Sequence, residues 1–198
     1  MSTIVVVRKG RAACIACDTL ATIGSRKQKA RYVEAPDKIF RFQDSFIGTT
    51  GYAVHNTVLQ SYFSRFPENV SLDTPAGIFE TWRTMHKVLR EEYHMNPRRE
   101  TDDPYETTRM TALVANPRGI FGVTPARDVE SFPRFWAIGS GTDYALGAMF
   151  VMYSRTDEVE AIARAGVEAG AEFDDASDLP VIVHAIELVG ESPVQARR

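Results

Sequence analysis

The chain has 198 residues and a formal net charge of −3 at pH 7, with 44% hydrophobic and 25% charged residues. This composition excludes a disordered or collagen-like chain, and the small negative charge lacks the basic excess of a nucleic-acid-binding protein. No apolar run approaches the roughly 20 residues that span a bilayer, and the N-terminus lacks the plan of a signal peptide. We therefore expect one cytoplasmic domain over residues 1–198, with a frayed tail over 190–198 and no nucleic-acid or membrane partner.

The first predicted element is a β-hairpin. β-Branched residues fill positions 3–7, a turn follows at 9–10, and residues 11–17 return. Ser2 directly follows the initiator methionine, and its small side chain allows an aminopeptidase to remove Met1. An N-terminal serine carries a hydroxyl group beside an α-amine that titrates near pH ~7.7–8, so it would combine a nucleophile with its own base.

The remaining elements follow from hydrophobic periodicity and from turn residues. Residues 26–31 are basic and predict a loop, 39–42 and 45–50 a second hairpin, and Val54, Val58, Tyr62 and Phe66 mark the buried face of a helix that Pro67 ends. A second helix begins at Thr74-Pro75 and ends near Tyr93, and residues 96–108 form a long loop. Strands are expected over 110–115, 119–124 and 135–138, a fully buried apolar helix over 144–153, another helix over 158–171 and a last strand over 181–188. This order suits two antiparallel sheets packed face to face, with a helix pair outside each.

Two cysteines form a C-x-x-C motif at Cys14 and Cys17, which invites a metal or redox interpretation. Residues three apart in a strand point to opposite faces, so these two thiols could not converge on one ion. We interpret both as small core residues and expect no metal and no cofactor. The four histidines show no spacing with a serine or cysteine that indicates a catalytic triad.

Several motifs together are similar to a known family. They are Ser-Thr-Ile-Val at 2–5, Cys-Asp-Thr-Leu-Ala-Thr-Ile-Gly at 17–24, Asp-Lys-Ile-Phe at 37–40, Gly-Thr-Thr-Gly at 48–51 and Gly-Ser-Gly-Thr-Asp-Tyr-Ala at 139–145. In this order they resemble the proteasome β-type N-terminal-nucleophile (Ntn) hydrolases, nearest to the bacterial HslV-like peptidases and proteasome homologues. The resemblance covers almost the whole chain. It implies an α+β fold, a four-layer αββα sandwich of two antiparallel sheets flanked by helix layers.

The resemblance also implies a set of site residues. The nucleophile of the family is a threonine sixteen residues before an aspartate; here that position holds Ser2, and Thr3 comes one residue too late. The implied catalytic residues are Ser2, Asp18, Lys38, Ser140, Asp174 and Ser177. The implied oxyanion donor is the backbone N–H of Gly51, with Gly48 as second candidate, and Leu20, Thr50 and Val54 would line the substrate pocket. The chain departs from the family at Asp178-Leu179-Pro180, where small glycine-like residues are usual, and at Tyr52, where many relatives have glycine.

The function implied by the resemblance is that of a self-compartmentalising, threonine-type endopeptidase, here with an N-terminal serine. It would assemble as a homo-oligomeric ring, stacked as a double ring, and cleave peptides or unfolded proteins. Because the sequence contains no P-loop, any ATPase unfoldase would be a separate chain. Two alternatives remain: an Ntn amidase acting on small amides, and a catalytically silent ring subunit if Met1 is retained. The second is disfavoured because α-type subunits carry an additional N-terminal helix.

Overall fold

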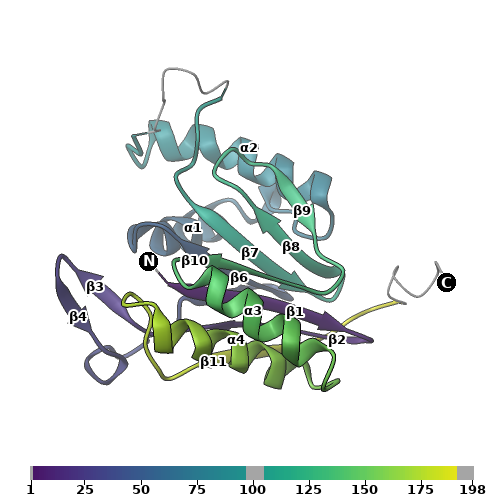
Figure 1. Ribbon diagram of the computed structural model, residues 1–198. Helices are drawn as coiled ribbons and strands as arrows, with labels where there is room; N and C mark the ends of the chain where they lie inside the picture. Colours follow the sequence, from purple (N-terminus) through teal and green to yellow (C-terminus); the bar gives the residue numbers. More distant parts are fainter. Residues whose placement is uncertain (1, 97–104, 191–198) are drawn as a thin grey trace.

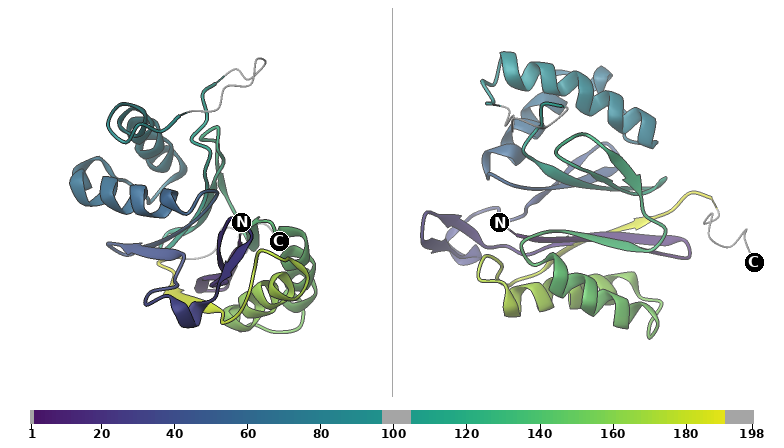
Figure 2. Two further views of the ribbon diagram at one scale, coloured as in Figure 1. Left: turned by 90° about the vertical axis from the view of Figure 1, so that its left-hand side faces the viewer. Right: turned by 45° about the horizontal axis from the view of Figure 1, so that its top comes forward.

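The computed structural model describes residues 2–96 and 105–190, which fold into four layers (Figure 1). Two sheets pack face to face, with one pair of helices outside each sheet (Figure 2). The helices are α1 (Val54–Arg65), α2 (Pro75–Glu91), α3 (Thr142–Tyr153) and α4 (Val159–Phe173), with 3₁₀ turns at Ala30–Tyr32 and Pro67–Asn69. The strands are β1 (Thr3–Lys9), β2 (Ala12–Cys17), β3 (Ala21–Ile23), β4 (Arg26–Gln28), β5 (Ile39–Phe42), β6 (Ser45–Thr50), β7 (Thr111–Asn116), β8 (Gly119–Val123), β9 (Val129–Ser131), β10 (Phe135–Gly139) and β11 (Ile182–Glu187). The predicted αββα sandwich is confirmed.

The first sheet has the strand order β10-β1-β2-β11, and all neighbouring strands are antiparallel. Its centre is the predicted hairpin of β1 and β2, in which Ile4 lies opposite Cys17. Ile4 packs into the core between the two sheets, whereas Val5 packs against α3 and α4. Because both faces of this strand are covered, its sequence is a continuous β-branched run without alternation.

The second sheet has the strand order β5-β6-β7-β8-β9 and packs against α1 and α2. Its helix-side core contains fully buried aromatic side chains, among them Tyr62, Phe63 and Trp82. α2 begins as predicted: the Thr74 side chain accepts a hydrogen bond from the Gly77 N–H at 3.1 Å. An N-cap of this kind typically stabilises a helix by about 1 kcal/mol.

The buried face of α1 differs from the predicted stripe. His55, Leu59, Tyr62 and Phe63 are buried, whereas Val54 is 57% exposed. Repeats of four residues drift around a helix of about 3.6 residues per turn, so a long series at this spacing cannot stay on one face.

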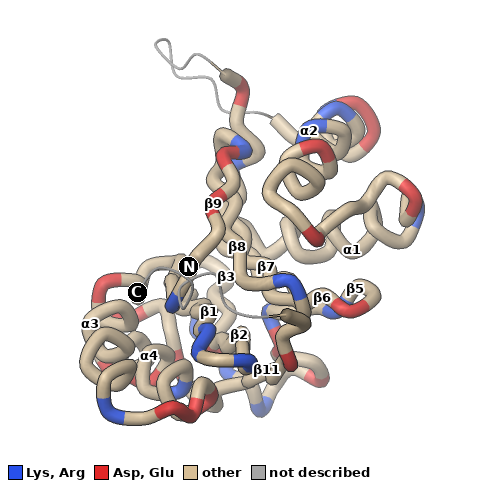
Figure 3. Tube along the Cα trace, turned by 90° about the vertical axis from the view of Figure 1, so that its right-hand side faces the viewer, with Lys and Arg blue, Asp and Glu red and all other residues tan. Residues whose placement is uncertain are grey.

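α3 is not fully buried within the chain, which corrects a second prediction. Ala145 and Met149 face the core, but Phe150 is 71% exposed and Tyr144 is 45% exposed. α3 packs on α4 and on β10 along one side, and its other side faces outward. Apart from Asp143 the helix carries no charged residue, as the tan tube of α3 shows (Figure 3).

The basic segment 26–31 is a third difference, because it contributes to a small hairpin. β3 and β4 pair from Ala21 opposite Gln28 to Ile23 opposite Arg26, with the turn at Gly24, whose φ is 61°. Strands of only three residues are too short for hydrophobic alternation to reveal them in a sequence, and β9 went unpredicted for the same reason. Most of the predicted loop 96–108 and of the tail 190–198 lies outside the described residues.

The two cysteines lie on opposite faces of β2, as predicted. Cys14 packs among residues of the α3–α4 side, and Cys17 packs between the sheets. Burial raises the pKa of Cys14 to about 12, which makes it an inert core thiol. Among the described residues, no group of three His, Cys, Asp or Glu side chains could hold a metal ion. No helix in the same part of the chain is long and apolar enough to cross a membrane.

Candidate active site

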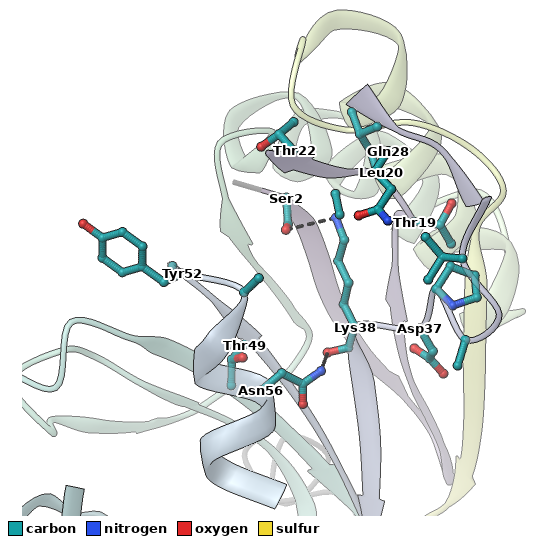
Figure 4. A pocket seen from close by; sticks show the side chains of 16 residues that line it. Ser2, Thr19, Leu20, Thr22, Gln28, Asp37, Lys38, Thr49, Tyr52 and Asn56 are labelled. Carbon is teal, nitrogen blue, oxygen red and sulfur yellow. Dashed lines mark hydrogen bonds between the residues drawn. The ribbon is translucent and has the colours of Figure 1, made fainter. Parts of the chain in front are cut away.

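The site lies at the end of the first sheet where β1 begins. Ser2 directly precedes β1 and lines a surface cavity there (Figure 4). Ser2 is 6% exposed, and its Oγ accepts a hydrogen bond from Lys38 Nζ at 3.1 Å. Lys38 directly precedes β5, so the β5–β6 hairpin positions it. The two hairpins together therefore place an ammonium group against the serine hydroxyl.

Asp18 lies directly after β2 and is fully buried. One carboxylate oxygen accepts from Lys38 Nζ at 2.7 Å and from the Thr3 N–H at 2.9 Å, and the other accepts from the N–H groups of Leu20 and Asp178 at 2.9 and 3.2 Å. A buried carboxylate needs such donors because burying an unpaired charge is costly. Asp18 thus holds Lys38 in place while three backbone amides share the stabilisation of its negative charge.

Thr3 cannot take the place of Ser2 in this arrangement. Its side chain is fully buried, and its Oγ1 lies 2.8 Å from Ser177 Oγ. A Cβ added at Gly141 or Gly170 would collide with that hydroxyl, so these two glycines leave the space that Thr3 occupies. Successive side chains of a strand alternate, and here the alternation sends Ser2 to the cavity and Thr3 away from it.

Ser140, Asp174 and Ser177 form one hydrogen-bonded group beside the backbone of the first residues. Ser140 Oγ and Ser177 Oγ each donate to Asp174 Oδ2 at 2.7 Å. Asp174 follows the last residue of α4, and Ser140 lies between β10 and α3. The Gly141 N–H donates to the Ser2 carbonyl at 3.4 Å, which connects this group to the start of the chain.

Asp178, at the departure from the family pattern, contacts both Asp18 and the β3–β4 hairpin. Its N–H donates to Asp18, its carbonyl accepts from the Thr19 N–H at 3.1 Å, and its carboxylate pairs with Lys29 Nζ at 2.8 Å. The hydrogen bond from Lys29 lowers the pKa of Asp178. Asp178 therefore joins the buried carboxylate of the site to a wall of the cavity.

The two oxyanion candidates occupy different surroundings. Gly51 lies at the cavity with a φ of 128°, in the turn between β6 and α1. Gly48 is inside β6, paired with Ile39 of β5 and Leu113 of β7, and its Cα faces the Ile4 side chain. The backbone of Gly48 belongs to the sheet, which leaves Gly51 as the candidate beside Ser2.

The cavity has a volume of about 410 Å³, and its wall near Gly51 differs by one residue from the sequence expectation. Leu20 lines it as expected. Thr50 and Val54 do not; Thr49 and Ala53 take those places. Other lining residues come from β3, β4 and the segment before β5, namely Ala21, Thr22, Gln28, Val33, Ala35 and Pro36.

Three polar residues near Lys38 were missed in the sequence. The Asp37 carboxylate accepts from the Ile39 N–H at 2.8 Å and lies 2.7 Å from His184 Nε2, and Asn56 Nδ2 donates to the Lys38 carbonyl at 3.3 Å. These contacts hold the backbone on both sides of Lys38. The adjacent Asp37-Lys38 pair was a possible signal, but His184 and Asn56 are distant in sequence and gave none.

Comparison with known proteins gives a consistent result. BPH of Thiobacillus denitrificans, a bacterial proteasome-like protein, is 44% identical over 96% of this chain and 100% of that chain, with a TM-score of 0.89. The same protein in complex with epoxomicin is 43% identical over 95% of this chain and 100% of that chain, with a TM-score of 0.88. Eukaryotic HslV from Trypanosoma brucei, at 20% identity over 93% and 99% of the two chains and a TM-score of 0.63, shares the fold. No family model and no curated protein matches the chain.

Proposed function

This chain belongs to the proteasome/HslV family of Ntn hydrolases, which are compartmentalised proteases, and we propose that it cleaves peptide bonds with Ser2 as nucleophile after removal of Met1. The observation that carries the proposal is the contact of Ser2 Oγ with Lys38 at a cavity, with Lys38 held by the buried Asp18. Met1 itself lies outside the described residues.

The proposed reaction is acyl transfer in two steps. Ser2 Oγ attacks the peptide carbonyl and forms an ester bond while the α-amine of Ser2 takes the hydroxyl proton. The amine of the broken peptide bond leaves after it receives that proton, and water then hydrolyses the ester through the same base. The positive charge of Lys38, 3.1 Å from Oγ, favours the developing alkoxide.

Two further groups have proposed roles in this reaction. The Gly51 N–H would donate to the oxyanion, a contribution typically worth roughly 2.7–4 kcal/mol in the chemical step. Ser140, Asp174 and Ser177 would orient the α-amine and its water, because their shared carboxylate lies beside the backbone of the first residues.

The substrate class follows from the cavity and from the family. Thr49, Ala53 and Leu20 form neutral walls, which suit apolar or small side chains next to the cleaved bond. We propose that several copies form a stacked ring in the cytoplasm, so that unfolded chains or short peptides reach the enclosed sites. A separate ATPase would supply unfolded substrates.

A pair of variants tests the nucleophile. Ser2→Ala removes the hydroxyl and should lower hydrolysis of a fluorogenic peptide by at least about 10³-fold, whereas Ser2→Thr keeps the hydroxyl and should remain active. Intact-mass measurement should show that the active protein begins at Ser2. Unchanged turnover in Ser2→Ala, or activity of a protein that retains Met1, would contradict the proposal.

Epoxomicin provides an independent probe, because BPH has been solved in complex with it. We propose that it binds in the cavity beside Ser2, and that it therefore blocks peptide cleavage by this chain. As a control for both tests, the native masses of Ser2→Ala and Ser2→Thr should equal that of the wild type. Equal masses exclude loss of assembly as the cause of lost activity.

A further inference from the structure

Lys38 comes from a different sheet than the two residues that it contacts. Ser2 directly precedes β1 and Asp18 directly follows β2, both in the first sheet, whereas Lys38 directly precedes β5, an edge strand of the second sheet. The 3.1 Å contact between Lys38 Nζ and Ser2 Oγ therefore depends on how the two sheets are held together at this end of the molecule.

Asp37 joins the start of β5 to the first sheet. One of its carboxylate oxygens accepts hydrogen bonds from the Ile39 N–H at 2.8 Å and from Cys17 Sγ at 3.5 Å. The other oxygen lies 2.7 Å from Nε2 of His184, a residue of β11, which is an edge strand of the first sheet. The carboxylate thus connects β5 of the second sheet with β2 and β11 of the first.

Cys17 completes a closed set of contacts around Lys38. Burial, and then the charge of Asp37, raise the pKa of the Cys17 thiol, so it keeps its proton and can donate to Asp37. Cys17 is followed directly by Asp18, whose carboxylate accepts from Lys38 Nζ at 2.7 Å. Lys38 extends toward Ser2, whereas the Asp37 side chain points away from it (Figure 4). Asp18 therefore holds the ammonium end of Lys38, and Asp37 holds its backbone end.

His184 is the strong side-chain donor to the Asp37 carboxylate. Because a carboxylate only accepts hydrogen bonds, Nε2 is the donor, and an imidazole N–H is a stronger donor than the thiol of Cys17. The imidazole ring also stacks on Phe46 of β6, with the ring centroids 4.7 Å apart. His184 therefore reaches from the edge of the first sheet to the second sheet through two separate contacts.

A loosened Asp37 would be felt at Ser2 before it is felt at Asp18. Lys38 Nζ lies 2.7 Å from a charged oxygen of Asp18 and 3.1 Å from the neutral hydroxyl of Ser2. The attraction of opposite charges keeps the ammonium at Asp18 when the backbone of Lys38 shifts, so the longer contact with Ser2 is lost first. A displacement of about 1 Å at a reacting group can lower a rate by about 10²-fold.

We propose that His184, acting through Asp37, is a positioning residue that keeps Lys38 Nζ against Ser2 Oγ. The inference rests on the proposed function, because it assumes that Lys38 assists the attack by Ser2. His184 does not touch the peptide in this role and acts only through the Asp37 carboxylate.

Two substitutions of His184 separate its hydrogen bond from its ring. His184→Gln keeps an N–H donor at the place of Nε2 but removes the ring, whereas His184→Phe keeps a ring that can stack on Phe46 but removes the donor. In peptide hydrolysis His184→Phe should lower kcat by about tenfold or more and leave KM within about twofold, and His184→Gln should retain most of the wild-type kcat.

Amide hydrogen exchange provides a readout that needs no activity. In His184→Phe the exchange at residues 37–39 should be at least about twofold faster than in the wild type, because Asp37 then holds the Ile39 N–H less firmly. In His184→Gln it should be unchanged. The native mass of both variants should equal that of the wild type.

The outcomes separate this inference from the proposed function. In a wild-type protein that cleaves peptides, an unchanged kcat in His184→Phe, or an equal loss of kcat in both variants, overturns the positioning role of His184. A wild-type protein that cleaves no peptide refutes the proposed function, and the exchange rates still test the contact with Asp37: equal exchange in His184→Phe and the wild type overturns it, and faster exchange confined to His184→Phe supports it.

Discussion

Gly51 is the residue at which backbone conformation matters most for the proposed chemistry. Its φ of 128° is rarely adopted by residues with a side chain, and a Cβ there would lie 2.7 Å from His55 Nδ1 and 3.0 Å from the Arg109 carbonyl. His55 is 3% exposed and cannot move aside cheaply. A side chain at position 51 would therefore shift the backbone and, with it, the Gly51 N–H.

We expect Gly51→Ala to lower kcat by about 10²–10³-fold, the size of a lost oxyanion donor, and to reduce the free energy of unfolding by about 1–3 kcal/mol. Peptide hydrolysis and urea unfolding measure the two effects. Gly24→Ala is the matched control: Gly24 has a φ of 61° and nothing within 4 Å of an added Cβ, so it tests backbone strain without the collision. Equal losses of kcat in the two variants would contradict a specific role for Gly51.

The ion pair between Lys29 and Asp178 is a connection between elements, since it ties the β3–β4 hairpin to the loop after α4. Lys29→Met should loosen the hairpin, with a cost of about 0.2–1 kcal/mol because the pair is partly exposed. Amide hydrogen exchange of residues 21–29 should rise by about two- to fivefold at pH 7 and low salt. Lys27→Met, which removes the neighbouring charge but no hydrogen bond to Asp178, is the control.

The same ion pair has a predictable pH dependence. The pKa of Asp178 is lowered in the folded protein, so its carboxylate contributes stability above its ordinary value of 3.8, and this contribution is lost as the pH falls through the folded pKa. The difference between wild type and Lys29→Met in urea unfolding should be full at neutral pH and disappear in acid. A difference that persists below that range would contradict the ion pair as its cause.

At the scale of elements, the strands could be predicted from the sequence more fully than the contacts between them. The β1–β2 hairpin was predictable because the β-branched run at residues 3–7 and the turn after it indicate a strand pair, whereas Asp18 and Lys38 were indicated by the order of the motifs that resemble the family. The predicted lining of the cavity was one residue away from the observed one, with Thr50 predicted where Thr49 lies. The reason is that the turn geometry at Gly51 decides which side chains point into the cavity. Contacts such as Lys29–Asp178 join distant segments and leave no pattern in either one.

For the whole molecule, the apolar side of α3 is the feature that a single chain does not explain. Tyr144, Phe150 and Val151 are 45, 71 and 43% exposed. Phe173 of α4 is 67% exposed, and its ring packs at a tilt against that of Tyr144. Large side chains gathered on one helix layer form an unfavourable surface in water. In a family whose members form stacked rings, a second copy of this chain is the partner that would cover it.

Phe150→Glu should therefore weaken assembly, because it places a charge in the apolar surface of α3 that a second copy would bury. We expect native mass measurements to show smaller species than in the wild type, at a concentration-dependent fraction, while far-ultraviolet circular dichroism stays unchanged. Phe79→Glu makes the same substitution on α2, in the opposite helix layer, where Phe79 is 41% exposed, and it should leave the mass unchanged. A wild-type mass for Phe150→Glu at all concentrations would show that α3 lies outside the interface, and its exposed phenylalanine would then need another partner.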